Sequence, residues 1–176
     1  MSERPQGLRP IFGDDFDSPT LDRSVWLPNY LPAWSSREAT AATYEIADSC
    51  LRLTIPPGQG LWCAADHEPP LRVSGIQSGN FSGPVGGTVG QQPYRADVTV
   101  REEQEPFWGW TPQNQYVEVR ARGVVSTRSM VAFWMVWRID QSGRRRSASP
   151  RCSETPWCRE CPQPSARGSI HSATPR

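Results

Sequence analysis

Residues able to recognise a sugar are concentrated between positions 116 and 140. Glu118 and Arg120 offer charged groups that hydrogen-bond hydroxyls, and an apolar run further on contains Trp134. Indole rings stack on the apolar faces of pyranose rings, which makes tryptophan a common floor of sugar clefts. We therefore take these three residues as candidate substrate-binding residues. The alternative is that the aromatic residues of the run, Phe133, Trp134 and Trp137, are all packed in a core.

Two strands are expected to position these side chains. From Tyr116 to Arg122, polar residues alternate with Val and Ala, a period of two that is typical of a half-buried strand. A turn is expected over 123–129. Met130–Trp137 is apolar throughout, which predicts a second strand with apolar side chains on both faces.

Further candidates lie upstream, among short period-two segments. Gln77 could hydrogen-bond sugar hydroxyls, although a loop amide that satisfies local backbone groups would look the same. Trp108 and Trp110 form an aromatic cluster that could be a stacking platform or could cap the core. Strands are also predicted at 42–46, at Cys50–Ile55 with Leu51, Leu53 and Ile55 inward, and at 97–101, with a hairpin turn at 47–49.

Four motifs occur in an order that resembles glycoside hydrolase family 16, the laminarinase and lichenase relatives. They are the opening Phe12–Asp22 with Val25-Trp26, the segment Leu71–Gly79, the strand Val117–Arg120 and the segment Ala132–Met135. The resemblance implies an all-β fold: an antiparallel β-sandwich of the concanavalin-like jelly-roll type, here incomplete. It also implies hydrolysis of a β-glucan-type polysaccharide by a retaining, two-carboxylate mechanism.

The catalytic strand of that family, which carries both carboxylates, is missing after Trp137. The acidic residues that follow are Asp140, Glu154 and Glu160, and Pro156 separates the last two. Glu102, Glu103 and Glu105 precede Pro106 and are expected in a solvated turn. No catalytic residue is therefore assigned, and this chain is expected to be inactive. A non-catalytic, lectin-like carbohydrate-binding module is the alternative function.

The charge balance changes at Asp140. Residues 1–140 contain 12 Arg and 16 acidic residues, a balance of −4, whereas residues 141–176 contain 7 Arg and 2 Glu, a balance of +5. The second segment is rich in Ser and Pro and is expected to be disordered. We place the domain boundary at Asp140, with a family-16-like domain over 1–140. Shifting the reading frame of the tail yields apolar alternation, so we interpret 141–176 as an out-of-frame, frame-shifted translation.

Weaker interpretations of the tail are a zinc site and a nucleic-acid contact. Cys152, Cys158, Cys161 and His171 could form the first, and Arg144–Arg146 the second. We expect neither a metal nor a cofactor, and no nucleic-acid partner. The expected partner is a polysaccharide or oligosaccharide, and the sequence does not indicate an oligomeric state. The chain shows no signal peptide and no apolar window of about 18 residues, so no membrane association and, by default, a cytoplasmic location are expected.

Overall fold

The computed structural model describes residues 7–113, 115–136 and 169–174 as an all-β chain of antiparallel strands. The described residues contain one 3-10 helix, η1 (Pro32–Trp34), and no α-helix. The seven strands are β1 (Arg9–Asp14), β2 (Thr43–Ala47), β3 (Cys50–Thr54), β4 (Gly79–Asn80), β5 (Phe107–Trp108), β6 (Tyr116–Arg120) and β7 (Ser169–Thr174). The predicted fold class, all-β and antiparallel, is confirmed.

The chain divides into two compact units, and this division does not follow the predicted boundary at Asp140. The first unit contains Met1–Asp17, Asp48–Cys50 and Pro112–Arg176, and the second contains Ser18–Ala47 and Leu51–Thr111. The candidate residues are therefore distributed over both units. Gln77, Trp108 and Trp110 belong to the second unit, and Glu118, Arg120 and Trp134 to the first.

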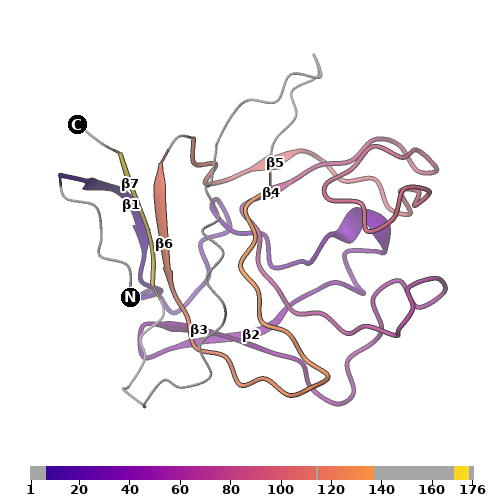
Figure 1. Cartoon of the computed structure of the whole chain (residues 1–176), viewed down its shortest axis with the longest axis horizontal. Helices are drawn as coiled ribbons and strands as arrows, with labels where there is room; N and C mark the ends of the chain where they lie inside the picture. The colour runs from indigo at the N-terminus through magenta and orange to yellow at the C-terminus, as the bar shows by residue number, and fades with distance from the viewer. Residues whose placement is uncertain (1–6, 114, 137–168, 175–176) are drawn as a thin grey trace. The chain divides into compact units, whose positions relative to one another are not determined.

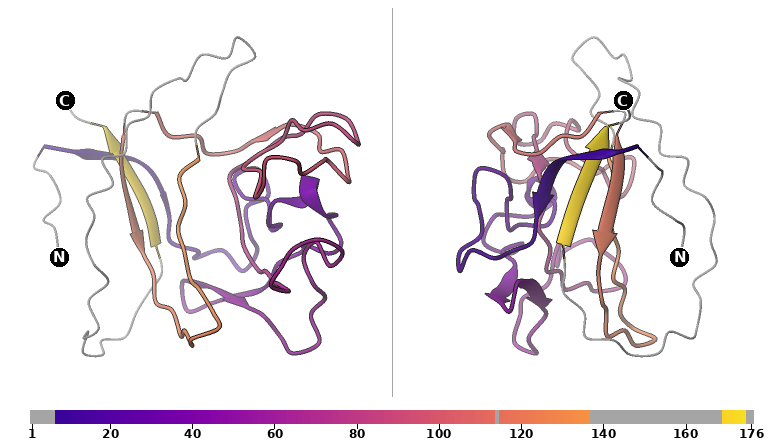
Figure 2. Two further views of the ribbon diagram at one scale, coloured as in Figure 1. Left: turned by 45° about the vertical axis from the view of Figure 1, so that its right-hand side comes forward. Right: turned by 90° about the vertical axis from the view of Figure 1, so that its left-hand side faces the viewer.

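The first unit is built on a three-stranded antiparallel sheet in the order β1-β7-β6. Figures 1 and 2 show β7 lying between the two other strands. On one side the register aligns Gly13 with His171, and on the other side it aligns Glu118 with His171. Strand β6 covers five of the seven residues of the predicted strand 116–122, but its burial does not alternate, because its first four residues are all of intermediate exposure.

Part of the tail contradicts the prediction of disorder. Ser169–Thr174 forms the central strand β7, although the whole of 141–176 was expected to be disordered. A strand is held by its backbone hydrogen bonds to its neighbours, so a segment with few apolar residues can join a sheet when both flanking strands offer unpaired edges. The rest of the tail, with the zinc-site cysteines and Arg144–Arg146, lies outside the described residues.

The predicted strand Met130–Trp137 is wrong over its described residues, 130–136. They form no ladder, and the large side chains of this segment are exposed, Met130 by 75% and Trp134 by 57%. A run of β-branched and aromatic residues favours an extended chain, but a strand also needs a partner with which to exchange hydrogen bonds. No described segment pairs with these residues, and the sequence pattern could not indicate this.

The hairpin of β2 and β3 is close to the predicted one. Its two turn residues, Asp48 and Ser49, both have φ of 54°, the left-handed backbone of a two-residue hairpin turn. The prediction of inward side chains is wrong for Leu53 and Ile55, which are 42% and 51% exposed. The alternation alone had implied a core on that face, whereas these two side chains remain exposed.

The second unit has its core around Trp34, which is fully buried in the helix η1. Residues packed in the same cluster are Leu31, Ala33, Trp62, Cys63, Val73, Val98 and Val100. The prediction of a strand over 97–101 is wrong, because these residues form no strand hydrogen bonds. Its alternation is nevertheless confirmed, since Val98 and Val100 are buried and the residues between and beside them are exposed.

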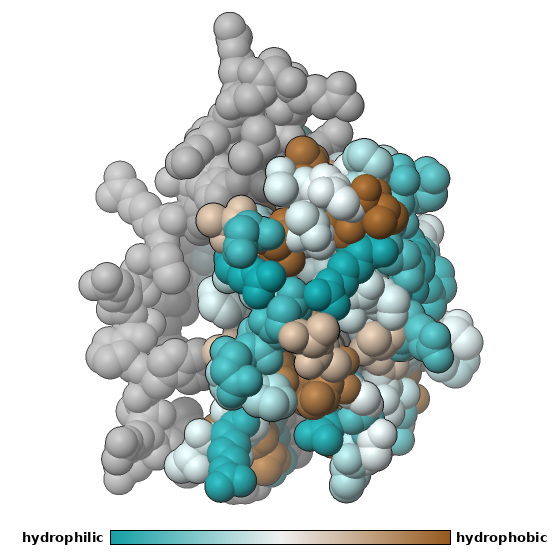
Figure 3. Space-filling model, turned by 90° about the vertical axis from the view of Figure 1, so that its right-hand side faces the viewer, coloured by the Kyte–Doolittle hydropathy of each residue, from teal (hydrophilic) through white to brown (hydrophobic). Residues whose placement is uncertain are grey.

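The surface shows little continuous apolar area where it is drawn in Figure 3. On that face, hydrophobic side chains lie in small groups separated by hydrophilic ones. In the part of the chain that the structure describes, no helix is both long enough and apolar enough to cross a membrane.

Candidate functional site

The short strands β4 and β5 bring three of the predicted residues together. Gly79 pairs with Trp108 and Asn80 with Phe107, and the Gly109 amide donates to the Ser78 carbonyl at 2.9 Å. On its other side, the Gln77 backbone exchanges hydrogen bonds with Leu27, at 2.8 and 2.9 Å. The second unit therefore carries Gln77 on one of two neighbouring chain segments and Trp108 and Trp110 on the other, although more than 30 positions separate Gln77 from the tryptophans in the sequence.

Trp108 lies against Gly79 and Phe81 and stays partly exposed. A Cβ on Gly79 would lie 3.4 Å from two carbons of its ring, so the indole covers the glycine. The Phe81 ring is 5.6 Å away and tilted by 31°. The side chain stays 37% exposed. An indole that rests on its neighbours and keeps part of its surface exposed has the chemistry of a stacking platform for a sugar ring.

Trp110 is held differently, by an edge-on contact. Its ring centroid lies 6.5 Å from that of the buried Trp26, with an angle of 63° between the planes. In the sequence, Gly109 lies between Trp108 and Trp110. It passes so close to Val25 that an added Cβ would lie 2.2 Å from the Val25 carbonyl oxygen. This close approach fixes the backbone that carries both rings.

A row of three side-chain amides begins at Gln77 and runs into the interior of the second unit. Gln77 Nε2 donates to Asn80 Oδ1 at 3.3 Å, and Asn80 Nδ2 donates to Gln104 Oε1 at 3.4 Å. Asn80 is 0% and Gln104 1% exposed, whereas Gln77 is half-buried. The row therefore leads from the candidate surface into the interior.

A charged pair closes the inner end of this row. Arg37 Nε donates to Gln104 Oε1 at 2.9 Å, and Gln104 Nε2 donates to the carbonyl and to a carboxylate oxygen of Glu102, both at 3.1 Å. The prediction of a solvated turn holds for Glu103 and Glu105, which are exposed, but Glu102 is half-buried. Sequence analysis missed Gln104, because nothing in its acidic surroundings indicates that it is buried.

The other three predicted residues lie in the first unit. Glu118 is half-buried and Arg120 exposed on β6, and two positions separate them, so both lie on one face of that strand. Trp134 is exposed and lies outside any strand, so the expected stacking floor on a strand is not formed. Nothing places these three residues with Gln77, Trp108 and Trp110.

The described residues provide neither a carboxylate pair on one strand nor a metal centre. Strands β1, β2 and β6 contain a single carboxylate each, Asp14, Glu45 and Glu118, and the other strands contain none. No group of three or more His, Cys, Asp or Glu is arranged to hold a metal ion in the same described regions. What the second unit offers chemically is stacking and hydrogen bonding.

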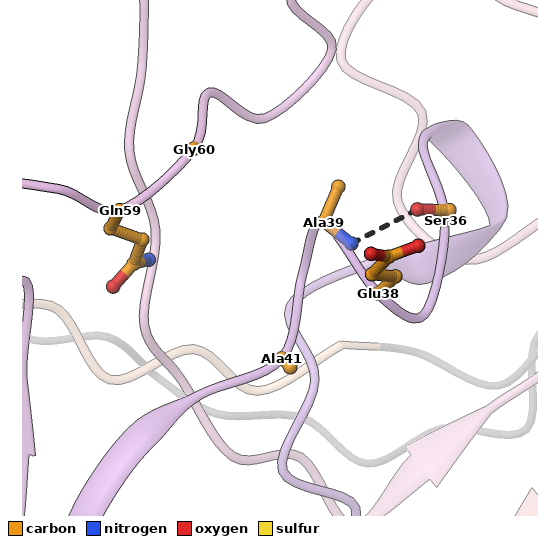
Figure 4. A pocket seen from close by; sticks show the side chains of 6 residues that line it. All are labelled: Ser36, Glu38, Ala39, Ala41, Gln59 and Gly60. Atoms are coloured by element: carbon orange, nitrogen blue, oxygen red, sulfur yellow. Dashed lines mark hydrogen bonds between the residues drawn. The ribbon is translucent and has the colours of Figure 1, made fainter.

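A separate hollow of about 300 Å³ lies elsewhere in the second unit (Figure 4). Its walls come from two segments, 36–41 on one side and Gln59-Gly60 on the other. Ser36 already accepts a hydrogen bond from the Ala39 amide at 3.0 Å. The Gln59 side chain donates to the Val73 carbonyl and accepts from the Thr43 hydroxyl. Glu38 is left as the one charged lining group, with no aromatic residue beside it. This hollow lacks the stacking surface that a sugar site needs.

A second polar cluster surrounds Asp66, whose carboxylate lies 3.0 Å from Arg95 and 2.8 Å from Arg101. The Tyr94 hydroxyl donates to the same carboxylate at 3.0 Å. With three partners, this carboxylate has little capacity left for a ligand. We interpret the cluster as structural, tying the segment 94–101 to the loop that contains Asp66.

Burial, followed by the hydrogen bond to Asp66, raises the pKa of Tyr94 to about 12. The folded chain thus keeps this proton between pH 10 and about 12, where an unfolded tyrosine releases it, so the contribution of Tyr94 to stability is full below pH 10 and falls as pH rises to 12. In an ultraviolet titration, the protein and a Tyr94→Phe variant should therefore show the same number of tyrosinates near pH 11, and the protein should gain one more than the variant at higher pH. Ionisation of Tyr94 near pH 10 would contradict the buried hydrogen bond.

Comparisons with known proteins connect this fold to glycosidases. No protein-family model and no curated protein matches the chain. Among solved structures, it is similar to the GlcNAcα1-4Gal-releasing endo-β-galactosidase from Clostridium perfringens, with 29% sequence identity and a TM-score of 0.50. The likeness covers 66% of this chain and 27% of that enzyme, so the chain spans about a quarter of its length. The chain has a glycosidase-like all-β fold.

Proposed function

We propose that the chain is a family-16-like glycosidase domain segment that binds a β-linked polysaccharide or oligosaccharide on the β4–β5 surface. The observation that carries the proposal is the exposed indole of Trp108, which lies on Gly79, two positions along the chain from the half-buried Gln77. A flat apolar ring next to a fixed hydrogen-bonding group matches a pyranose, which has an apolar face and a rim of hydroxyls.

Two substrate classes are supported by different observations. The motifs of the sequence resemble laminarinases and lichenases, which favours β-1,3- and β-1,4-glucans. The similar solved structure is an endo-β-galactosidase, which favours a galactose-containing glycan. Binding should therefore be measured for laminarin, lichenan and a β-galactan side by side.

We expect binding without turnover. A retaining glycosidase needs two carboxylates about 5–5.5 Å apart, and none of the described strands carries two. Reducing-sugar release from the three glycans should stay at background for this chain. In the frame-shift interpretation, a gene whose tail is restored to the other frame should gain activity. Turnover by the chain as it stands would contradict the proposed absence of a catalytic pair.

Trp108→Ala should weaken glycan binding by about 1–3 kcal/mol, the size expected for one large ring that is covered by the ligand. Trp134→Ala is the matched control, since it removes the same type of side chain from an exposed position of the first unit. Isothermal titration of both variants with the glycan that binds best will separate the two surfaces. Equal losses in both variants would show that Trp134 also contacts the sugar, and a loss in Trp134→Ala alone would move the site away from β4–β5.

The alternative function is a lectin-like module that has no hydrolytic role in any frame. It predicts the same binding and the same effect of Trp108→Ala, but no activity in the frame-corrected version. The frame-corrected assay therefore distinguishes the two.

A further inference from the structure

In the row of side-chain amides formed by Gln77, Asn80 and Gln104, each amide donates from its nitrogen to the oxygen of the next. The contacts of Gln104 at the inner end set this direction. An arginine nitrogen can only donate a hydrogen bond, so Arg37 must face the oxygen of the Gln104 amide. The carbonyl and the carboxylate of Glu102 can only accept, so they must face the Gln104 nitrogen. Turning this amide over would place like groups together at both ends, and the orientation of Gln104 is therefore fixed from two sides.

This fixed orientation is passed outward through Asn80. The Gln104 oxygen needs a donor, so Asn80 presents its nitrogen there and its oxygen to the other side. That oxygen in turn needs a donor, so Gln77 must present its nitrogen. The amide oxygen of Gln77 is then directed away from the row. Among the described residues nothing donates a hydrogen bond to that oxygen.

The burial of the row makes this direction costly to reverse. Asn80 and Gln104 are almost completely shielded from water, and a buried amide that faces a like group loses its hydrogen bond with no solvent to replace it. The backbone amide of Gln104 is also held, by the Ser82 hydroxyl at 2.8 Å. Arg37 and Glu102 are further linked, because the Arg37 backbone amide donates to the Glu102 carboxylate.

We propose that Gln104 is a positioning residue that acts through Asn80 to fix Gln77 as a hydrogen-bond acceptor for a sugar hydroxyl. This inference rests on the proposed function and adds a specificity to it. A hydroxyl must donate its proton to Gln77, so a sugar substituent that can accept but not donate is rejected at that position.

Fluorinated sugars test the direction of the hydrogen bond. The probes are methyl β-glucoside and methyl β-galactoside, each with its monodeoxy and monodeoxyfluoro analogues at every ring position. If Gln77 accepts, both replacements at one position should lower affinity by a similar factor, about three- to tenfold. A fluoro analogue that binds as well as the parent at every position where the deoxy analogue is weakened would overturn the proposal.

Gln104→Leu removes the fixed end of the row and leaves the Trp108 surface untouched. The Asn80 and Gln77 amides can then turn over, so the discrimination against the fluoro analogue should fall while the parent sugar still binds. Gln77→Leu should lose the discrimination altogether. Circular dichroism melting checks that both variants fold. Full discrimination retained in folded Gln104→Leu would also overturn the proposal.

Nitrogen-15 resonances of the side-chain amides give a second test that needs no sugar. In the folded chain, the Gln77 NH₂ signals should shift when Gln104 is replaced by Leu, two hydrogen bonds away. Signals that do not change would contradict coupling along the row. If no glycan binds but the shift is seen, the proposed function fails and the positioning of Gln77 by Gln104 stands.

Discussion

Replacing Trp34 by alanine is expected to lower the free energy of unfolding by about 3–5 kcal/mol, because a large side chain at the centre of the core is removed and the cavity cannot collapse fully. Trp34 is fully buried and its ring nitrogen donates to the Gln91 carbonyl at 2.7 Å. Its ring also lies against Gly90, where an added Cβ would be 2.7 Å from a ring carbon. The variant thus loses packing and also leaves the Gln91 carbonyl without this donor.

Urea denaturation followed by circular dichroism measures this loss. The control is Trp134→Ala, which removes the same side chain from a position that is 57% exposed, and it should change the free energy by no more than about 0.5 kcal/mol. Similar losses in the two variants would mean that burial of Trp34 does not dominate the stability of the second unit.

The residues that were predicted well are those whose structure depends on near neighbours. Alternation indicated strand β6. The turn of the β2–β3 hairpin was indicated by Asp48 and Ser49, small polar residues that tolerate a left-handed backbone. In these cases the side-chain pattern and the local backbone carry the information.

The failures concern pairing with distant segments. Residues 130–136 have a strong strand composition but no partner among the described segments, and β7 has a weak composition but two partners. A single sequence records which residues prefer an extended backbone, whereas it does not record which edges are available. The domain boundary at Asp140 was also placed by composition, and it stays a prediction because it lies outside the described residues.

The residues of the candidate site could be chosen from the sequence, but their arrangement could not, because it depends on pairing between distant segments. Gln77, Trp108 and Trp110 were chosen for their chemistry, and the pairing of β4 with β5 unites them. Gln104 was missed because its role depends on Arg37, which is 67 positions away. The one local signal was Gly79, a residue without a side chain two positions after Gln77, which leaves room for an aromatic ring.

Gly109→Ala is expected to disturb the candidate site more than any substitution of its polar residues. The new Cβ would lie 2.2 Å from the Val25 carbonyl oxygen and less than 3 Å from two other backbone atoms of that residue. These are backbone contacts, which cannot be relieved by turning a side chain. The backbone between Trp108 and Trp110 must therefore move, and overpacking of this kind costs about 1–3 kcal/mol or more.

The expected result is a lower unfolding midpoint together with weakened glycan binding, because the rings of Trp108 and Trp110 shift with Gly109. Gly58→Ala is the matched control, since an added Cβ there meets nothing within 4 Å. It should leave both stability and binding unchanged. The decisive comparison is binding measured well below both midpoints, where each variant is folded. If Gly109→Ala then binds glycan as tightly as Gly58→Ala, the sugar does not depend on the geometry of Trp108 and Trp110, and the β4–β5 surface is not the binding site.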